Sequence, residues 1–382
     1  MPTIALAAGE TSGDMLGAEL MHALRARIPD CAFVGIGGAY MEGEGLDSLI
    51  AVEEFDLSKN ILRDLLQLPT FFKLMDATAE HIVAAKPEAV IFIDSPEINH
   101  RIAQRVKKRA PDTRLICYVA PSVWAWRRGR ARKMAEIFDA VMVQFPFEPP
   151  IFEKEGGCPC RFVGHAAVER LADPDALPDF KQAHGLSPET PLLILMPGSR
   201  ANELAFSLPL FGETLRKLDV GNLALVIPVL PHTREAVKAA VANWSIAPIL
   251  LEDDKAKFAS FKAARAAVSV SGTATLELGL AGVPTAIVYR IGFFWSVILP
   301  HILRTPSIGL ANLILDRPVM PEFIQERATA DNLAHALRGL LTDEAANMAQ
   351  RRALADLGAT LTAEGTPPSQ RAAEVVCEIM NA

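Results

Sequence analysis

The apolar residues of this chain fall into short continuous runs, which alternate with longer stretches patterned like helices. Continuous runs are typical of strands in a parallel sheet, because helices cover both faces of such a sheet and bury every side chain. We expect strands in the first part of the chain at residues 3–8, 31–36, 89–94, 115–119 and 140–144. In the second part we expect them at 192–196, 223–229, 248–251, 267–271 and 285–289. The alternation predicts an α/β fold with doubly wound, Rossmann-like sheets.

The alternation stops between residues 145 and 180, where prolines and glycines accumulate. Such a stretch predicts a junction between two domains. We therefore expect an N-terminal domain at 1–165, a second Rossmann-like domain at 166–345, and C-terminal helices at 346–382 that pack back on the first domain. We expect the two domains to face each other across a cleft, with ligands at the carboxyl ends of the strands.

Composition excludes two classes of protein. Half of the 382 residues are apolar and 22% are charged, which excludes a mainly disordered chain. The longest stretch without a charged residue, Val220 to Thr233, has 14 residues and two prolines, whereas a membrane-spanning helix needs roughly 20 apolar residues. Five cysteines without a pairing pattern, and an apolar N-terminus without a preceding basic segment, predict a cytoplasmic location. The mean hydropathy of +0.22 is nevertheless high.

The net charge of −7 is unevenly distributed. The segment from Arg101 to Lys133 holds eleven basic residues and one acidic residue, so it carries +10 and the rest of the chain −17. A solvated helix face and a surface that meets phosphates or anionic lipid both explain this segment.

Polar residues follow two expected strands of the first part. The turn after residues 3–8 contains Glu10, Ser12 and Asp14 but no lysine, so it suits sugar hydroxyls or proton transfer better than a phosphate. Capping of the next helix is the alternative for this turn. Asp94 ends the strand at 89–94, where partial desolvation suits a general base. Capping of the following helix is again the alternative.

The second part has two turns suited to a diphosphate. Gly198, Ser199 and Arg200 follow one strand and offer close backbone approach, a hydroxyl and a fixed cation. A second turn, with Ser271, Gly272 and Thr273, opens a helix whose N-terminal dipole favours phosphate. Glu277, one turn into that helix, suits the hydroxyls of a ribose. Together the turns indicate a nucleotide diphosphate site.

Other patterns carry less weight. Gly35 to Gly38 lacks the glycine that a dinucleotide fingerprint requires, since Tyr40 takes its place. Trp124 and the arginines after it form one isolated run in an acidic chain, so we expect no nucleic-acid partner. Asp173 and Asp175 have the spacing of a metal-binding pair but lie in the expected junction. We expect no metal and no cofactor.

The motifs taken together resemble the lipid-A-disaccharide synthase family, whose members are inverting two-domain glycosyltransferases of the GT-B type. The matching segments run in order over nearly the whole chain: residues 8–14, 93–94, 121–127, 162–165, 197–200, 271–274 with Glu277, 289–290, and 311–313 with Gln325.

The resemblance implies that UDP-2,3-diacylglucosamine is the donor and 2,3-diacylglucosamine 1-phosphate the acceptor. The products would be a β-1,6-linked tetraacyl disaccharide 1-phosphate and UDP. It implies that Asp94 is the base, that Arg200 contacts the diphosphate, and that the turn at Glu10 to Asp14 lies on the acceptor side. It also places Arg290, Asn312 and Gln325 on the nucleotide side.

Two apolar runs fit acylated substrates. One contains Leu62, Leu65, Leu66, Leu68, Phe71 and Phe72; the other spans residues 291–303. Core packing explains both runs equally well, but an interfacial surface would place the enzyme on the anionic inner membrane, with the Arg101–Lys133 segment supplying the attraction. The alternatives are another UDP-sugar enzyme of the same fold, such as a cell-wall glycosyltransferase or a UDP-sugar 2-epimerase, and a catalytically silent nucleotide-sugar or lipid binder.

Overall fold

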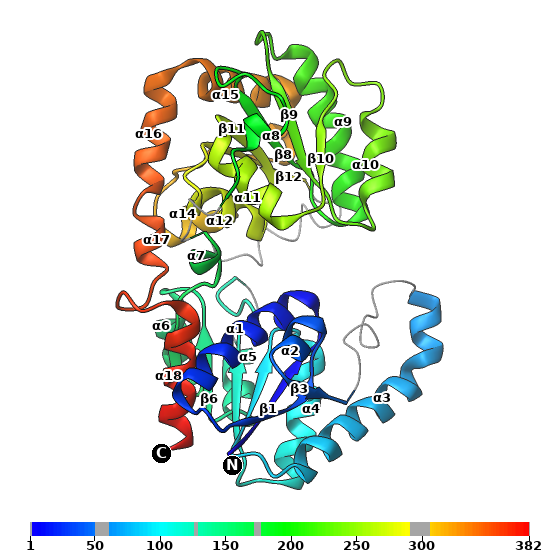
Figure 1. The fold of residues 1–382 in the computed structure, drawn as a ribbon, viewed down its shortest axis with the longest axis vertical. Helices are drawn as coiled ribbons and strands as arrows, with labels where there is room; N and C mark the ends of the chain where they lie inside the picture. The colour runs from blue at the N-terminus through cyan, green and yellow to red at the C-terminus, as the bar shows by residue number, and fades with distance from the viewer. Residues whose placement is uncertain (1, 50–60, 126–128, 172–176, 291–305, 382) are drawn as a thin grey trace. The chain divides into compact units, whose positions relative to one another are not determined.

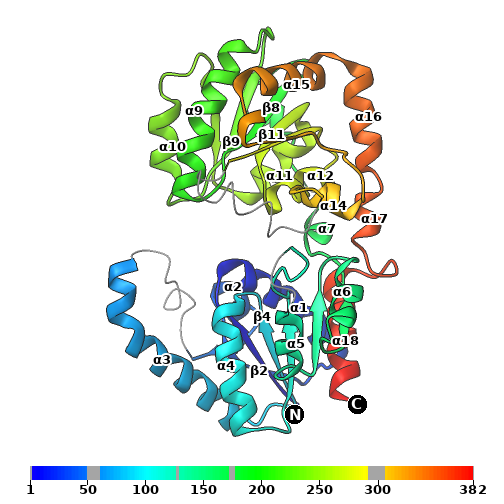
Figure 2. The ribbon, with the colours of Figure 1, turned by 180° about the vertical axis from the view of Figure 1, so that it is seen from behind.

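The computed structural model describes residues 2–49, 61–125, 129–171, 177–290 and 306–381, with the backbone alone at 61–71. It divides into two compact units, one of residues 1–166 with 361–382 and one of residues 167–360. Each unit contains a parallel sheet with helices on both faces (Figures 1 and 2), as the apolar runs predict.

The first unit has a seven-stranded sheet in the order β3-β2-β1-β4-β5-β6-β7. Its strands are β1 (Thr3–Ala8), β2 (Ala32–Ile36), β3 (Leu46–Ser48), β4 (Ala89–Ile93), β5 (Arg114–Tyr118), β6 (Ala140–Val143) and β7 (Cys160–Phe162). Its helices are α1 (Thr11–Arg27), α2 (Ala39–Gly43), α3 (Ile61–Ala84), α4 (Pro96–Arg109), α5 (Arg130–Ala135), α6 (Glu148–Lys154) and α18 (Pro368–Met380).

Alternate residues of the central strand β1 enter different cores. In β1, Ile4 and Leu6 pack with residues of α1 and α18, whereas Ala5 and Ala7 pack with residues of α3 and α4. Both faces of the sheet are therefore buried, which explains why the strand is apolar throughout. The last helix lies along α1 (Figure 1), so the chain returns to the first unit at its end.

The second unit has a six-stranded sheet in the order β10-β9-β8-β11-β12-β13. Its strands are β8 (Leu192–Met196), β9 (Ala224–Pro228), β10 (Ile249–Leu251), β11 (Ala266–Val270), β12 (Thr285–Tyr289) and β13 (Glu322–Ile324). Its helices are α7 (Ala167–Arg170), α8 (Phe180–Ala183), α9 (Ala201–Lys217), α10 (Arg234–Val241), α11 (Asp254–Ala263), α12 (Thr273–Leu280), α14 (Leu310–Ile314), α15 (Ala330–Thr342), α16 (Glu344–Leu354) and α17 (Leu357–Thr360), with a 3-10 turn at Gln325–Arg327.

The C-terminal segment expected at 346–382 does not form one piece. Helices α16 and α17 belong to the second unit, and only α18 belongs to the first. The residues of α18 that face inward, Ala372, Ala373, Val375 and Val376, are fully or almost fully buried.

Candidate active site

The ends of β1 and β4 bring together the first two predicted groups. These strands are paired in parallel with Ala8 opposite Ile93, so the residues that follow them share one edge of the sheet. Ser12, in the first turn of α1, donates a hydrogen bond of 3.1 Å from its hydroxyl to Oδ2 of Asp94. The predicted base thus lies where the strand pattern places it, with one carboxylate oxygen held by Ser12.

The turn at the end of β4 has an uncommon backbone. Asp94 and Ser95 have φ angles of 53° and 42°, in the left-handed region that residues with a side chain rarely occupy. Ser95 is the N-cap of α4, and its side chain makes no capping hydrogen bond. The capping alternative therefore does not explain why an aspartate stands at position 94.

Two glycines of the α1 turn make room for this backbone. A Cβ atom on Gly9 would lie 2.9 Å from the side chain of Ser95, and one on Gly13 would lie 3.3 Å from the carbonyl oxygen of Ile93. Both distances are tighter than ordinary van der Waals contact, so these glycines let α1 approach the end of β4.

Asp14 has a different role from its neighbours. It is buried, and its carboxylate accepts hydrogen bonds from the backbone N–H groups of Gly38 (2.7 Å), Tyr40 (3.1 Å) and Met41 (3.1 Å). This carboxylate therefore binds the N-terminus of α2, and its contact with the acceptor stays a prediction. Glu10, the exposed N-cap of α1, and Ser12 remain as candidates for that contact.

Glu148 is another buried carboxyl of the first unit. Glu148 begins α6, is 3% exposed, and accepts a hydrogen bond of 3.0 Å from the backbone N–H of Phe145. Burial raises the pKa of Glu148 to about 8, because the charged form loses its hydration.

The second unit contains a cavity of about 510 Å³ at the carboxyl ends of its strands. Its lining includes all seven residues that the two turns and the following helix were predicted to contribute to a nucleotide diphosphate site. They are Gly198, Ser199, Arg200, Ser271, Gly272, Thr273 and Glu277. The turns lie side by side because β8 and β11 are neighbours in the sheet. The structure thus brings both predicted turns into one cavity.

The first of these turns is already bound to a carboxylate. Glu203, in the first turn of α9, accepts hydrogen bonds from the backbone N–H groups of Ser199 (2.9 Å) and Arg200 (3.2 Å). It also accepts one from the Arg200 guanidinium, at 3.2 Å. A Cβ atom on Gly198 would clash with Glu203, so this glycine seats the carboxylate.

The second turn has no such acid. Helix α12 begins after Gly272, at a φ of 150°, with no side-chain cap and no acidic residue in its first turn. Ser271 donates its hydroxyl hydrogen to the carbonyl of Ile308 (2.9 Å). Since uncapped helix N-termini attract anions, the N-terminus of α12 is the better place for a phosphate group.

Sequence reasoning missed a cation in this cavity. Lys257 of α11 lies 3.3 Å from a carboxylate oxygen of Glu277 and 3.0 Å from one of Asp254. Its side chain is only 17% exposed. It holds the Glu277 carboxylate at the wall of the cavity, and nothing in the local sequence of α11 indicates that contact.

The remaining three residues placed on the nucleotide side do not line this cavity. Asn312 is buried: its side-chain amide donates to the carbonyl of Met320 (2.8 Å) and to Glu322 (2.9 Å), and its oxygen accepts from the N–H of Met320 (2.7 Å). Arg290 lies over the ring of Phe206, and Gln325 has a φ of 53°. The structure thus gives Asn312 a role in the fold.

The basic segment is partly neutralised by acids outside it. Asp76 of α3 binds both Arg105 (3.1 Å) and Arg109 (2.9 Å) of α4. Phe72, 37% exposed, lies beneath the guanidinium groups of Arg101 and Arg105, at 5.7 and 5.9 Å. The side chains of Leu62, Leu65, Leu66, Leu68 and Phe71, and the apolar run at 291–303, fall outside the described residues.

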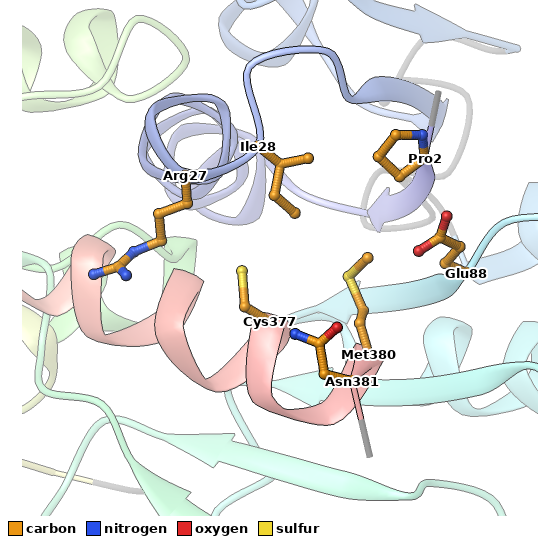
Figure 3. Close-up of a pocket in the computed structure, with 7 residues that line it drawn as sticks. All are labelled: Pro2, Arg27, Ile28, Glu88, Cys377, Met380 and Asn381. Carbon is orange, nitrogen blue, oxygen red and sulfur yellow. The ribbon is translucent and has the colours of Figure 1, made fainter.

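Another cavity of the first unit lies at the opposite edge of the sheet. It measures about 620 Å³, and Pro2 and Glu88, which precede β1 and β4, line it. Cys377 and Met380 of α18 point toward Ile28 and Pro2 (Figure 3). This cavity is remote from Asp94, so it has no part in the proposed chemistry.

Two absences hold for the described residues. They include no group of three or more histidine, cysteine or acidic side chains arranged to hold a metal ion, and Asp173 and Asp175 lie outside them. Within the same residues, no helix combines the length and apolar character needed to cross a bilayer.

Sequence comparison with known proteins finds the same family by two routes, a family model and individual relatives. A family model described as lipid-A-disaccharide synthetase matches residues 4–375. The lipid-A-disaccharide synthase of Nitrobacter hamburgensis is 42% identical over 382 residues, which cover 99% of this chain and 96% of that protein. The one from Rhodospirillum centenum is 41% identical over 381 residues, covering 99% and 94%.

Solved structures resemble the chain in fold. The UDP-GlcNAc 2-epimerase of Neisseria meningitidis, bound to UDP-GlcNAc, has a TM-score of 0.67 at 8% identity and covers both chains completely. The calicheamicin glycosyltransferase CalG4 has a TM-score of 0.58 at 14% identity, covering 100% of this chain and 98% of its own. At such identities the likeness shows the two-domain fold alone.

Proposed function

Since the chain belongs to the lipid-A-disaccharide synthase family, we propose that it transfers 2,3-diacylglucosamine from UDP to 2,3-diacylglucosamine 1-phosphate. The products are the β-1,6-linked tetraacyl disaccharide 1-phosphate and UDP. Two observations, one in each unit, support the residue assignments below. An uncapped helix N-terminus and Arg200 line one cavity of the second unit, and the first unit presents an oriented carboxylate at the end of β4.

In the proposed reaction, Asp94 acts as the general base. It takes the proton from the 6-hydroxyl of the acceptor as that oxygen attacks the anomeric carbon of the donor. The bond from this carbon to the diphosphate oxygen breaks, and UDP leaves from the opposite side, which inverts the configuration. Ser12 holds Oδ2 of Asp94, so Oδ1 is the oxygen that meets the acceptor.

The leaving diphosphate needs positive charge in the second unit. The dipole at the N-terminus of α12 supplies part of it. Arg200 supplies the rest: its side chain is 83% exposed, whereas that of Glu203 is 17% exposed. The Arg200 side chain can therefore turn toward the diphosphate while Glu203 still accepts the hydrogen bonds from the Ser199 and Arg200 N–H groups.

Glu277 is proposed to bind the ribose hydroxyls of UDP. Its carboxylate lines the same cavity one turn into α12, and Lys257 fixes its position from α11. A carboxylate can accept a hydrogen bond from each of two neighbouring hydroxyls. Binding of UDP and of 2′-deoxy-UDP, measured by calorimetry, tests this role: we expect Glu277→Gln to reduce the preference for the ribose form.

The acylated substrates lead us to propose that the protein binds the surface of the anionic inner membrane. Exposed cations on α4 and α5, including Arg101, Lys108 and Arg132, supply the attraction, and Phe72 adds an exposed ring beside them. In flotation with vesicles containing an anionic phospholipid, Lys108→Glu with Arg132→Glu should weaken binding. Arg216→Glu with Lys238→Glu, two exposed cations of the second unit, is the control of equal net charge. Equal binding of the wild type and both double variants would contradict this surface.

Incubation of the purified protein with both proposed substrates tests the reaction itself. We expect equimolar disaccharide 1-phosphate and UDP. Release of UDP without disaccharide would indicate a different acceptor or a hydrolase. Conversion of UDP-GlcNAc to its 2-epimer would support the epimerase alternative, and UDP-sugar binding without any turnover would indicate a silent binder.

A further inference from the structure

The strained turn after β4 needs a group that keeps it in place. The N–H of Asp94 still donates to the carbonyl of Tyr118 in β5, at 2.9 Å, so the sheet continues up to that atom. The next two φ angles, at Asp94 and Ser95, are both left-handed. Neither residue is a glycine, so the chain would relax to ordinary angles if nothing opposed this.

Asn99, in the first turn of α4, supplies the opposing contacts. Its side chain is buried, with 3% exposure. Its amide nitrogen donates to the carbonyl oxygens of Asp94 (2.7 Å) and Ile93 (2.9 Å), and lies 3.3 Å from that of Ala7 in β1. One side chain therefore ties the strained turn, the end of β4 and the end of β1 together.

We infer that Asn99 is a positioning residue for glycosyl transfer, whose amide holds the left-handed Asp94–Ser95 turn and so aims the Asp94 carboxylate. The inference rests on the proposed function, in which Asp94 accepts the proton of the acceptor. Ser12 reaches Asp94 only while the turn keeps this shape, so loss of the amide would release the carboxylate from both supports.

Steady-state kinetics of Asn99→Ala tests the inference. We expect kcat to fall by about 10- to 100-fold, because a misplaced base affects the chemical step. The KM values for both substrates and the Kd for UDP should change less than about twofold. Unchanged kcat, or a loss confined to KM or UDP binding, would overturn the inference.

The second unit offers a matched control. Asn347 is fully buried, and its amide donates to the carbonyls of Arg265 (2.8 Å) and Leu340 (2.7 Å). Asn347→Ala should lower Tm at least as much as Asn99→Ala, with kcat within about twofold of the wild type. An equal loss of kcat in both variants would reduce the role of Asn99 to general stability.

A rescue experiment separates strain from packing. Glycine adopts left-handed angles without a side-chain penalty, so Ser95→Gly should restore part of the activity of Asn99→Ala. We expect the loss caused by Asn99→Ala to be at least threefold smaller in the Ser95→Gly background. Equal losses in both backgrounds would overturn the inference. If Asn99→Ala does not fold, Asn99→Asp, which keeps the volume but donates no hydrogen bond when ionised, takes its place.

Asp94→Asn, measured alongside, separates this inference from the proposed function. Normal turnover of Asp94→Asn would contradict the proposed base itself. An inactive Asp94→Asn together with a fully active Asn99→Ala would contradict only the positioning role.

Discussion

Two turns occupy equivalent positions in the two units but differ in their backbone and side chains. One follows β4, which pairs with β1, and the other follows β11, which pairs with β8; β1 and β8 are the first strands of their sheets in chain order. This is the place where the order of a doubly wound sheet reverses and where ligands bind. In the first unit the turn is Asp94–Ser95, with left-handed angles and no glycine; in the second it is Ser271–Gly272, where the glycine takes the unusual angle.

The difference follows from what each turn presents. In the proposed reaction the first turn supplies a general base, which needs a side chain; this turn has an aspartate, and Asn99 binds its backbone. The second turn is proposed to bind a phosphate, which needs close approach to backbone N–H groups; this turn has a glycine, and the N-terminus of α12 is uncapped. The first turn thus presents a carboxylate side chain, and the second presents the backbone N–H groups of an uncapped helix N-terminus.

The largest expected effect is the pH dependence of the free energy of unfolding that the buried carboxyl of Glu148 causes. The pKa of Glu148 in the folded state, about 8, lies above its usual value of 4.5. The folded state therefore binds a proton that the unfolded state has already lost. The free energy of unfolding should fall between pH 4.5 and 8, by up to about 1.4 kcal/mol per pH unit.

Glu148→Gln should remove that decline and stabilise the protein at pH 8. Denaturant unfolding of both proteins at pH 5 and at pH 8 measures the effect. The same difference between the two pH values in wild type and variant would show that Glu148 does not retain its proton.

Arg200 of the second unit should make the largest single contribution to UDP binding. Arg200→Ala is expected to weaken UDP binding by about 1.5–3 kcal/mol, since a charge-assisted contact with the diphosphate is lost. Isothermal titration calorimetry measures it. Arg216→Ala, at an exposed arginine near the end of α9, serves as control. Equal affinities of the two variants would place Arg200 away from the diphosphate.

Gly272, in the turn after β11, should affect UDP binding only through its backbone angle. A Cβ atom at Gly272 would meet nothing within 4 Å, so Gly272→Ala tests the angle rather than a clash. We expect UDP binding to weaken by about 1–2 kcal/mol. Gly221→Ala also meets nothing within 4 Å and should leave binding unchanged; an equally harmless Gly272→Ala would show that the angle is not required.

The smallest effect should come from the serine of the first turn. The Ser95 hydroxyl is buried and finds no hydrogen-bond partner among the described residues, and its φ is left-handed. Ser95→Gly should therefore raise the free energy of unfolding by about 1 kcal/mol, with little change in kcat because Asn99 still holds the turn. A less stable variant in denaturant unfolding would mean that the turn is unstrained.

The apolar runs predicted the sheet well and its edges poorly. All ten expected strands are present, because each lies in a continuous apolar run of the sequence. This includes β10, which has three residues and lies at an edge. The strands β3, β7 and β13 were missed. Each has three residues and lies at the edge of its sheet, so pairing with a neighbour defines it rather than its own sequence pattern.

The sequence predicted which residues lie at the strand ends, while their functional roles stay predictions. Asp94 lies at the end of β4, and the seven residues predicted in the second unit line one cavity. Glu203 also left a signal, since a glutamate three residues after an N-cap is the pattern of a capping box. Asn99 and Lys257 left none, because their roles depend on φ angles and on contacts with distant segments.

Turnover of Asp94→Asn tests the central claim most directly. The substitution keeps the shape of the side chain and removes the base. We predict that formation of the disaccharide falls by at least about 100-fold, while UDP binds with wild-type affinity because its site lies in the other unit. Asp112→Asn, an exposed aspartate of the first unit, should remain fully active. Near-normal turnover of Asp94→Asn would contradict the account.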